Sequence, residues 1–309
     1  MVNLRCRRPH RVGFTLIELL VVITLIGVLA ALSAGAFMRV RASQIKAASE
    51  ATLVKLNTAL DNRWKAIQES VNEDQKKNQG QWPNALLAAG GNPDVAKSLL
   101  MYAKVKNELP MTFAEAKAPT ILTVNPGSGP VSIILASKQV FSTLPISAAN
   151  FQEQSAICFY LAVTTSAGGG AMLDSDGLNQ QTADAPNFPG FKVYKDAWDM
   201  PIAFVRHAYA TELDDKPFVR NIAAANKDPF DPAGKLPAVM AVNPMLWKQI
   251  TNNAPTGYTI PSPYVSNRNH VPTLVSAGPN KSYEPDLFAG TDNDNLLSYR
   301  LRREGNRGD

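Results

Sequence analysis

The feature that most constrains this chain is an uninterrupted apolar run close to its N-terminus. From Leu19 to Met38 there is no charged residue, and Thr24 and Ser33 are the only clearly polar ones. At about 1.5 Å per residue, a helix over this run extends for about 30 Å, which is the thickness of the hydrocarbon core of a bilayer. The run therefore predicts a membrane-spanning helix over residues 14–38.

Charged residues flank the apolar run. Four arginines lie within the first 13 residues, one acid, Glu18, stands directly before the run, and three basic residues follow it by Lys46. The excess of positive charge before the run favours a cytoplasmic N-terminus. An ordinary signal peptide, cleaved after the A-x-A-like site Ala34–Ala36, and a permanent single-pass anchor are two interpretations. The carboxylate beside the apolar segment disfavours the signal peptide.

Residues Gly13 to Glu18 resemble the processing motif of type IV prepilins and of the pseudopilins of type II secretion. In that family a short basic leader ends in glycine, a membrane peptidase cleaves after it, and the new N-terminal residue, commonly phenylalanine, is N-methylated. An acid follows four residues later, and Gly13, Phe14 and Glu18 occupy these positions here. The resemblance implies a leader over residues 1–13 and processing at Gly13 and Phe14 by a prepilin peptidase/methyltransferase.

The resemblance also implies a role for Glu18 in assembly. Cleavage after Gly13 creates an α-amino group at Phe14, and Glu18 lies about one helical turn from it on the same face. In the family this glutamate is thought to meet the amine of a neighbouring subunit, so the implied partners are other pilin or pseudopilin subunits in a homo- or hetero-oligomeric fibre. A desolvated pair of this kind would fix the register between subunits. The alternative is a glutamate that only reaches the lipid headgroups.

An amphipathic stripe continues the helix beyond the membrane. Its apolar residues recur at steps of three and four, and they are Leu53, Leu56, Leu60, Trp64, Ile67 and Val71. Because no proline lies between the apolar run and Pro83, we expect one helix from about residue 16 to 76. Residues 39–76 would form its periplasmic amphipathic half and residues 77–309 a globular, pilin-like head. The expected fold is an α+β lollipop, anchored in the inner membrane by a single pass.

The head is expected to hold a small antiparallel sheet packed on the long helix, with extra short helices and long loops. The predicted helices are 92–106, a short one that begins near Thr112 with a capping box to Glu115, and 150–164. The predicted strands are 131–136, 202–207, 273–276 and 296–301. Residues 119–130 are rich in proline, glycine and threonine, which predicts a loop.

Two stretches of the head resemble parts of the pseudopilin head. Residues 196–202 resemble a D-x-W-G-x-P turn before a sheet strand, with Asp199 in place of the glycine. Residues 275–294 resemble the calcium-binding loop of the major pseudopilin, which implies Asp292 and Asp294 as carboxylate ligands. Calcium takes six to eight oxygen ligands of this kind. An exposed acidic turn that binds no metal is the alternative.

Composition and missing motifs argue against other classes. Four of the 31 Lys and Arg lie in the first 13 residues, and the chain has 26 Asp and Glu, so the remainder is close to neutral. No nucleic-acid partner is therefore expected. Phosphate-binding glycine loops and the nucleophile elbow of hydrolases are absent from the sequence, so no enzyme is expected.

We interpret the chain as a structural subunit of a type II secretion pseudopilus, which aids protein secretion. The alternatives are a type IV pilus subunit for adhesion or motility, and a membrane-anchored or secreted binding protein or hydrolase.

Overall fold

The structure, a computed structural model, describes eight parts of the chain. They are residues 15–146, 150–165, 181–208, 231, 234–251, 271–283, 294–298 and 301. The chain divides into two compact units, Met1–Ala47 and Ala48–Asp309. The leader expected at 1–13, with Gly13, and the following Phe14 lie outside the described residues.

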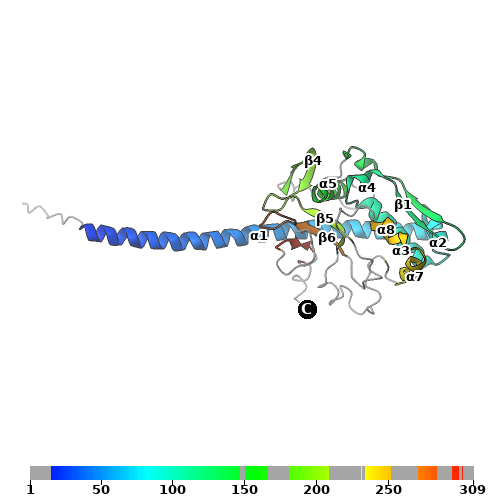
Figure 1. The fold of residues 1–309 in the computed structure, drawn as a ribbon, viewed down its shortest axis with the longest axis horizontal. Helices are drawn as coiled ribbons and strands as arrows, with labels where there is room; N and C mark the ends of the chain where they lie inside the picture. The colour runs from blue at the N-terminus through cyan, green and yellow to red at the C-terminus, as the bar shows by residue number, and fades with distance from the viewer. Residues whose placement is uncertain are drawn as a thin grey trace, which may run out of the picture. The chain divides into compact units, whose positions relative to one another are not determined.

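One continuous helix, α1 (Leu16–Lys77), begins in the first unit and ends in the second (Figure 1). Its bounds confirm the single helix expected over residues 16 to 76. Lys76 and Lys77 lie in its last turn, where their positive charge complements the negative end of the helix dipole. The next residue, Asn78, has a φ of 48°, and this left-handed conformation ends the helix.

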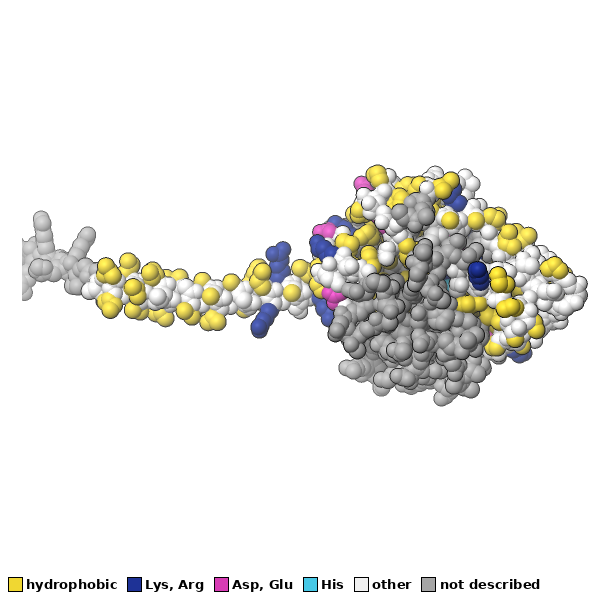
Figure 2. All heavy atoms as spheres, viewed as in Figure 1, with side chains coloured by type: hydrophobic (Ala, Val, Ile, Leu, Met, Phe, Trp, Pro, Cys, Tyr) yellow, Lys and Arg dark blue, Asp and Glu magenta, His cyan; other side chains and the backbone are white. Residues whose placement is uncertain are grey.

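In the first unit, the apolar side chains of α1 are exposed. Figure 2 shows hydrophobic side chains over the visible face of this part of the helix. Leu16 is 83% exposed and Leu32 is 68% exposed. Judged by length and composition, α1 is the one helix in the described part of the chain that is apolar enough to cross a membrane. A surface this apolar is unfavourable in water and suits the hydrocarbon core of a bilayer.

In the second unit, one face of α1 enters the hydrophobic core. The stripe residues Leu53, Leu56, Leu60, Ile67 and Val71 are buried, and Trp64 is partly buried against them. Full burial of one such side chain contributes about 1.5–3 kcal/mol relative to exposure. The burial confirms the apolar stripe predicted from the sequence and places its residues in the hydrophobic core of the head.

Short helices follow α1 within the second unit. They are α2 (Trp82–Ala88), α3 (Pro93–Glu108), α4 (Phe113–Lys117), the 3-10 helix η1 (Gln139–Phe141), α5 (Phe151–Thr164), α7 (Leu236–Val242) and α8 (Met245–Thr251). Asn92 caps α3, because its side chain accepts from the backbone nitrogens of Asp94 and Val95. Thr112 caps α4 by accepting from Glu115 N at 3.1 Å. The three predicted helices are therefore confirmed.

The described strands form three small antiparallel sheets. Their members are β1 (Thr120–Val124) with β2 (Val131–Leu135), β3 (Thr182–Ala185) with β4 (Phe188–Tyr194), and β5 (Ala203–Ala208) with β6 (Val271–Ser276) and β7 (Leu296–Leu297). The α+β class is confirmed, with three sheets where one was expected. The expected last strand, 296–301, is shorter, because its ladder with β6 covers only two residue pairs.

The loop expected over residues 119–130 is partly wrong. Thr120–Val124 is strand β1, paired with β2 so that Ile121 lies opposite Ile134. The strand is rich in β-branched residues, and alternate residues are buried, which is the pattern of a sheet with one covered face. The prolines and glycines that indicated a loop lie on either side of the strand, with Pro119 directly before it and the others in the connection after Val124.

Candidate functional site

The first turn of α1 is closed by reciprocal hydrogen bonds between Thr15 and Glu18. Glu18 N donates to Thr15 Oγ1 at 3.3 Å, while Thr15 N and Thr15 Oγ1 donate to Glu18 Oε2 at 2.8 and 2.9 Å. This is a capping box, in which each residue satisfies a polar group that the helix end leaves open. This cap was not predicted from the sequence, although a Thr-x-x-Glu spacing before an apolar run is its signal.

The capping box fixes the position of the Glu18 carboxylate at the N-terminal end of α1. In the described part of the chain, its hydrogen bonds all go to Oε2, so Oε1 remains available to a further donor. Gly13 and Phe14 are not among the described residues, and their predicted roles in processing stay predictions. Because Phe14 directly precedes Thr15 in the sequence, an amine created there would belong to the same helix end.

Two glycines of α1 have open surroundings. A Cβ added at Gly27 or at Gly35 would meet nothing within 4 Å in this chain. Packing within the chain therefore does not require glycine at either position, and each costs about 1 kcal/mol of helix stability relative to alanine. Glycine at these two positions would allow another helix to approach α1 closely.

In the head, a tight turn is organised by the carboxylate of Asp196. Its Oδ1 accepts from Trp198 N and from Met200 N, both at 2.9 Å, and its Oδ2 accepts from Ser276 Oγ at 2.6 Å. Asp196 is 3% exposed, and this burial raises the pKa of its carboxyl, against the lowering effect of the hydrogen bonds. Asp199 has a φ of 67°, a left-handed conformation that favours glycine.

The Asp196 turn also contacts α1. Ala197 N donates to Ser49 Oγ at 3.0 Å, and Ser49 is fully buried within the second unit. The Asp196–Ser276 bond joins the two sequence stretches that resemble the pseudopilin head. These stretches, 80 residues apart, therefore meet each other and the long helix at one place.

The predicted calcium ligands are only partly described. Asp292 lies outside the described residues. Asp294 is described, and no donor in the described part of the chain reaches its buried Oδ1. Gly278 approaches it closely, because a Cβ there would lie 2.4 Å from the Asp294 carbonyl oxygen. No group of three metal-ligating side chains occurs among the described residues. A buried carboxylate oxygen without a donor is an atom that a cation would satisfy.

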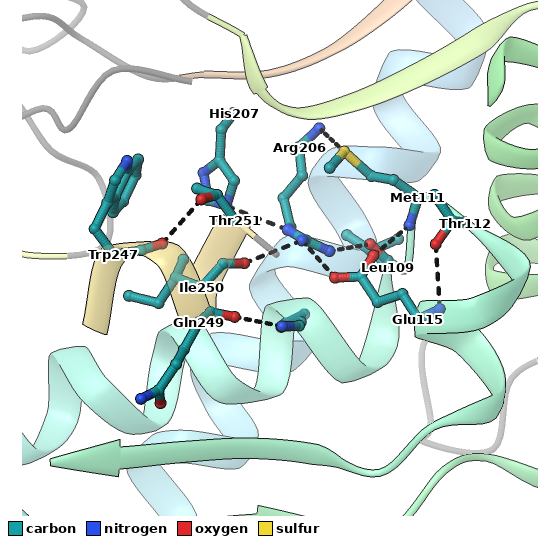
Figure 3. Close-up of polar contacts among 11 residues, drawn as sticks. Leu109, Met111, Thr112, Glu115, Arg206, His207, Trp247, Gln249, Ile250 and Thr251 are labelled. Carbon is teal, nitrogen blue, oxygen red and sulfur yellow. Dashed lines mark hydrogen bonds and ion pairs between the residues drawn. The ribbon is translucent and has the colours of Figure 1, made fainter. Parts of the chain in front are cut away.

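A buried ion pair lies within the head, and Figure 3 shows its contacts. Arg206 Nη2 donates to Glu115 Oε1 at 2.7 Å, and both side chains are 1% exposed. The guanidinium also donates to the carbonyl oxygens of Leu109, at 3.0 Å, and Ile250, at 3.4 Å, and to His207 Nε2 at 3.2 Å. These contacts satisfy the buried charges, which burial would otherwise make costly. This pair was not predicted from the sequence.

A second cation reaches the same region from α3. Lys106 Nζ donates to the carbonyl oxygen of Gln249, next to the Ile250 carbonyl that Arg206 binds. The last carbonyls of α8 are thereby capped by two basic side chains. Burial lowers the pKa of Lys106 to about 8, with Glu115 raising it and Arg206 lowering it to smaller extents. The arrangement has a structural role, because the two basic side chains hold the C-terminal end of α8 in place.

Comparison with known proteins gives one match. Residues 13–34 match the family model of the prokaryotic N-terminal methylation motif, which is typical of type IV prepilin-like proteins. No curated protein and no solved structure matches the chain. The motif supports a type IV pilin-like or pseudopilin subunit. It implies processing by a prepilin peptidase and assembly with other pilin-like subunits, which are typically not enzymes.

Proposed function

We propose that this chain is a structural subunit of a type II secretion pseudopilus, or of a related fibre, that aids protein secretion. The observation that carries the proposal is the methylation motif at residues 13–34, placed at the start of a helix with an exposed apolar surface. In this proposal Gly13 is the cleavage position and Phe14 becomes the methylated N-terminus. The helix holds the subunit in the inner membrane, and the head is periplasmic.

Glu18 is the assembly residue of the proposal. Its carboxylate lies in the first turn of α1 and keeps Oε1 available while Oε2 closes the capping box. An amine from a neighbouring subunit would supply the donor that Oε1 lacks. In an apolar medium this charge-assisted bond is favoured, because each charge alone is costly there.

The choice of a secretion pseudopilus over a type IV pilus rests on the head. The bond between Asp196 and Ser276 joins the two stretches that resemble pseudopilin motifs. The methylation motif by itself fits either kind of fibre, so the type IV pilus subunit is the second candidate. A membrane-anchored or secreted binding protein or hydrolase is a third candidate, which the motif disfavours.

The test is cross-linking in membranes that contain a prepilin peptidase. We expect Glu18→Gln to be cleaved after Gly13 and to lose the cross-linked multimers of the wild type, because the variant keeps the capping-box oxygen and removes the charge. The matched control is Glu69→Gln, which removes an exposed acid elsewhere on α1 and should leave both steps intact. Unchanged multimers of Glu18→Gln would contradict the assembly role.

We also propose calcium as a structural ion of the head, with Asp292 and Asp294 as carboxylate ligands. The proposal is supported by the buried Asp294 Oδ1, which no donor in the described part of the chain reaches. Calcium would neutralise this carboxylate. It would also link the segment that carries Asp294 to the Asp196 turn, because Gly278 lies against Asp294 and Ser276 donates to Asp196.

A further inference from the structure

A pocket of about 150 Å³ opens in the head beside the amphipathic half of α1. Arg63 of α1, Glu108 at the end of α3 and Lys138 before η1 form its charged side, and Val140, Phe141 and Ala162 of η1 and α5 form its apolar side. None of its residues belongs to the processing motif, and no role in the proposed function uses it.

The charged side of the pocket holds two cations and one anion. Arg63 Nη2 contacts Glu108 Oε2, and Lys138 Nζ contacts Glu108 Oε1. Both oxygens of Glu108 are thus engaged, and one positive charge remains uncompensated within this trio. The three side chains are only 8%, 20% and 21% exposed, so solvent screens this excess charge less than it would at the surface.

One donor of a residue that lines the pocket has no acceptor. In the described part of the chain, nothing accepts a hydrogen bond from the buried Nε of Arg63. A buried N–H without an acceptor is unfavourable, and such groups are rare in folded proteins. The guanidinium has the planar geometry that suits a carboxylate. Arg63 therefore places excess positive charge at the pocket wall and holds a buried N–H group without an acceptor behind it.

We propose that this pocket binds a carboxylate carried by a short apolar chain. The carboxylate pairs with the excess positive charge of Arg63 and Lys138, while the apolar chain contacts Phe141 and Ala162. A cavity of about 150 Å³ holds a molecule the size of benzene, which sets the ligand at about six heavy atoms. The excess of one positive charge and the apolar wall favour a monoanion of this kind over a phosphate. The proposal goes beyond the proposed function and does not depend on it.

Two sources supply this chemistry: a free short-chain acid, and the C-terminal carboxylate of a peptide. The first probe is butyrate, with neutral butanamide as its isostere. The second probe is the tripeptide Ala-Ala-Val with a free C-terminus, with the C-terminal amide as its control. Binding to the full-length protein in detergent micelles is measured by titration calorimetry.

We expect saturable binding of at least one carboxylate probe and at least tenfold weaker binding of its amide. Preference for butyrate assigns the site to a free acid, and preference for the peptide assigns it to a chain terminus. If neither carboxylate binds, or if acid and amide bind equally, the proposal is overturned. This comparison uses the wild-type protein and does not depend on the folding of a variant.

Substitutions inside and outside the pocket test whether the ligand binds there. Val140→Trp fills the pocket without touching its charges and should weaken binding at least tenfold, whereas Ile134→Trp, at an exposed apolar position of β2, should not change it. Arg63→Lys keeps the charge and removes the planar guanidinium, and it should weaken binding by a similar factor. Wild-type affinity in a folded Val140→Trp protein would place the ligand elsewhere and contradict the proposal.

Discussion

Glu18 Oε2 accepts hydrogen bonds from both the backbone nitrogen and the hydroxyl of Thr15, at 2.8 and 2.9 Å. The acid of the methylation motif therefore caps the first turn of its own helix without a partner subunit. In the proposed fibre it has two tasks, because one carboxylate oxygen caps α1 and the other is left for an amine. A glutamine at this position preserves the first task and abolishes the second.

Replacing Thr15 separates the cap from the charge. Thr15→Val removes the hydroxyl and should weaken the first turn by about 0.5–2 kcal/mol. Hydrogen exchange of the Glu18 amide in micelles should then accelerate by roughly 2- to 30-fold. Thr24→Val is the control, since the Thr24 hydroxyl donates to Val21 O and does not contact Glu18. Equal exchange of the Glu18 amide in wild type and Thr15→Val would show that the cap does not hold the turn.

The Asp196 turn should be a strong determinant of head stability. Asp196→Ala leaves the donors Trp198 N, Met200 N and Ser276 Oγ without their acceptor, and should lower the free energy of unfolding by about 2–4 kcal/mol. Ser276→Ala removes one hydrogen bond to this carboxylate and should cost about 1 kcal/mol. Urea unfolding measures both. A loss for Asp196→Ala no larger than that for Ser276→Ala would mean that the turn does not depend on the carboxylate.

Asp199 tests backbone strain in the same turn. Because its φ is 67°, Asp199→Gly should be more stable than Asp199→Ala by about 1–2 kcal/mol. Both variants lose the ion pair with Lys195, so the difference between them reports the backbone alone. Urea unfolding of the two variants gives this difference, and equal stabilities would contradict the left-handed conformation.

The lowered pKa of Lys106 predicts that the free energy of unfolding increases as the pH rises above neutrality. Its folded pKa of about 8 lies below the ordinary value of 10.5, so above pH 8 the unfolded chain binds the extra proton. The free energy of unfolding should therefore increase from pH 8 to 9.5, by an amount on the order of 1–2 kcal/mol. Lys106→Met should flatten this rise. The window ends before the tyrosines ionise, and a falling wild-type curve within it would contradict the prediction.

Calcium should stabilise the head through Asp294. Adding millimolar calcium chloride to chelator-treated protein should raise the Tm by several degrees, because a ligand that binds only the folded state shifts unfolding. Asp294→Asn should abolish the shift, and magnesium should not replace calcium, since it demands a stricter octahedral geometry. An identical Tm with calcium and with chelator would leave Asp294 without this role.

Local signals in the sequence predicted the long helix and the starts of α3 and α4. The stripe from Leu53 to Val71 repeats at helical spacing, and Asn92 and Thr112 cap helices through neighbours two or three residues away. Strand β1 was missed because the prolines and glycines on either side of it dominated the composition of the whole segment. The Thr15–Glu18 cap was also local, and its spacing was visible in the sequence.

The long-range pairs of charged residues could not be predicted from the sequence. Arg206 and Glu115 are 91 residues apart, and neither stands in a pattern that distinguishes a buried charge from an exposed one. Arg63 and Lys138 of the pocket meet Glu108 only because α1, α3 and η1 pack together. Such pairs follow from tertiary packing, and a single sequence does not encode them in a local pattern.

The most direct test of the central claim is the intact mass and N-terminal sequence of the protein isolated from membranes. The proposed function predicts a chain that begins at Phe14 and carries one methyl group on its α-amino nitrogen. A chain that begins after Ala36 would show cleavage by an ordinary signal peptidase. The apolar half of α1 would then be removed, and assembly through that helix would be contradicted.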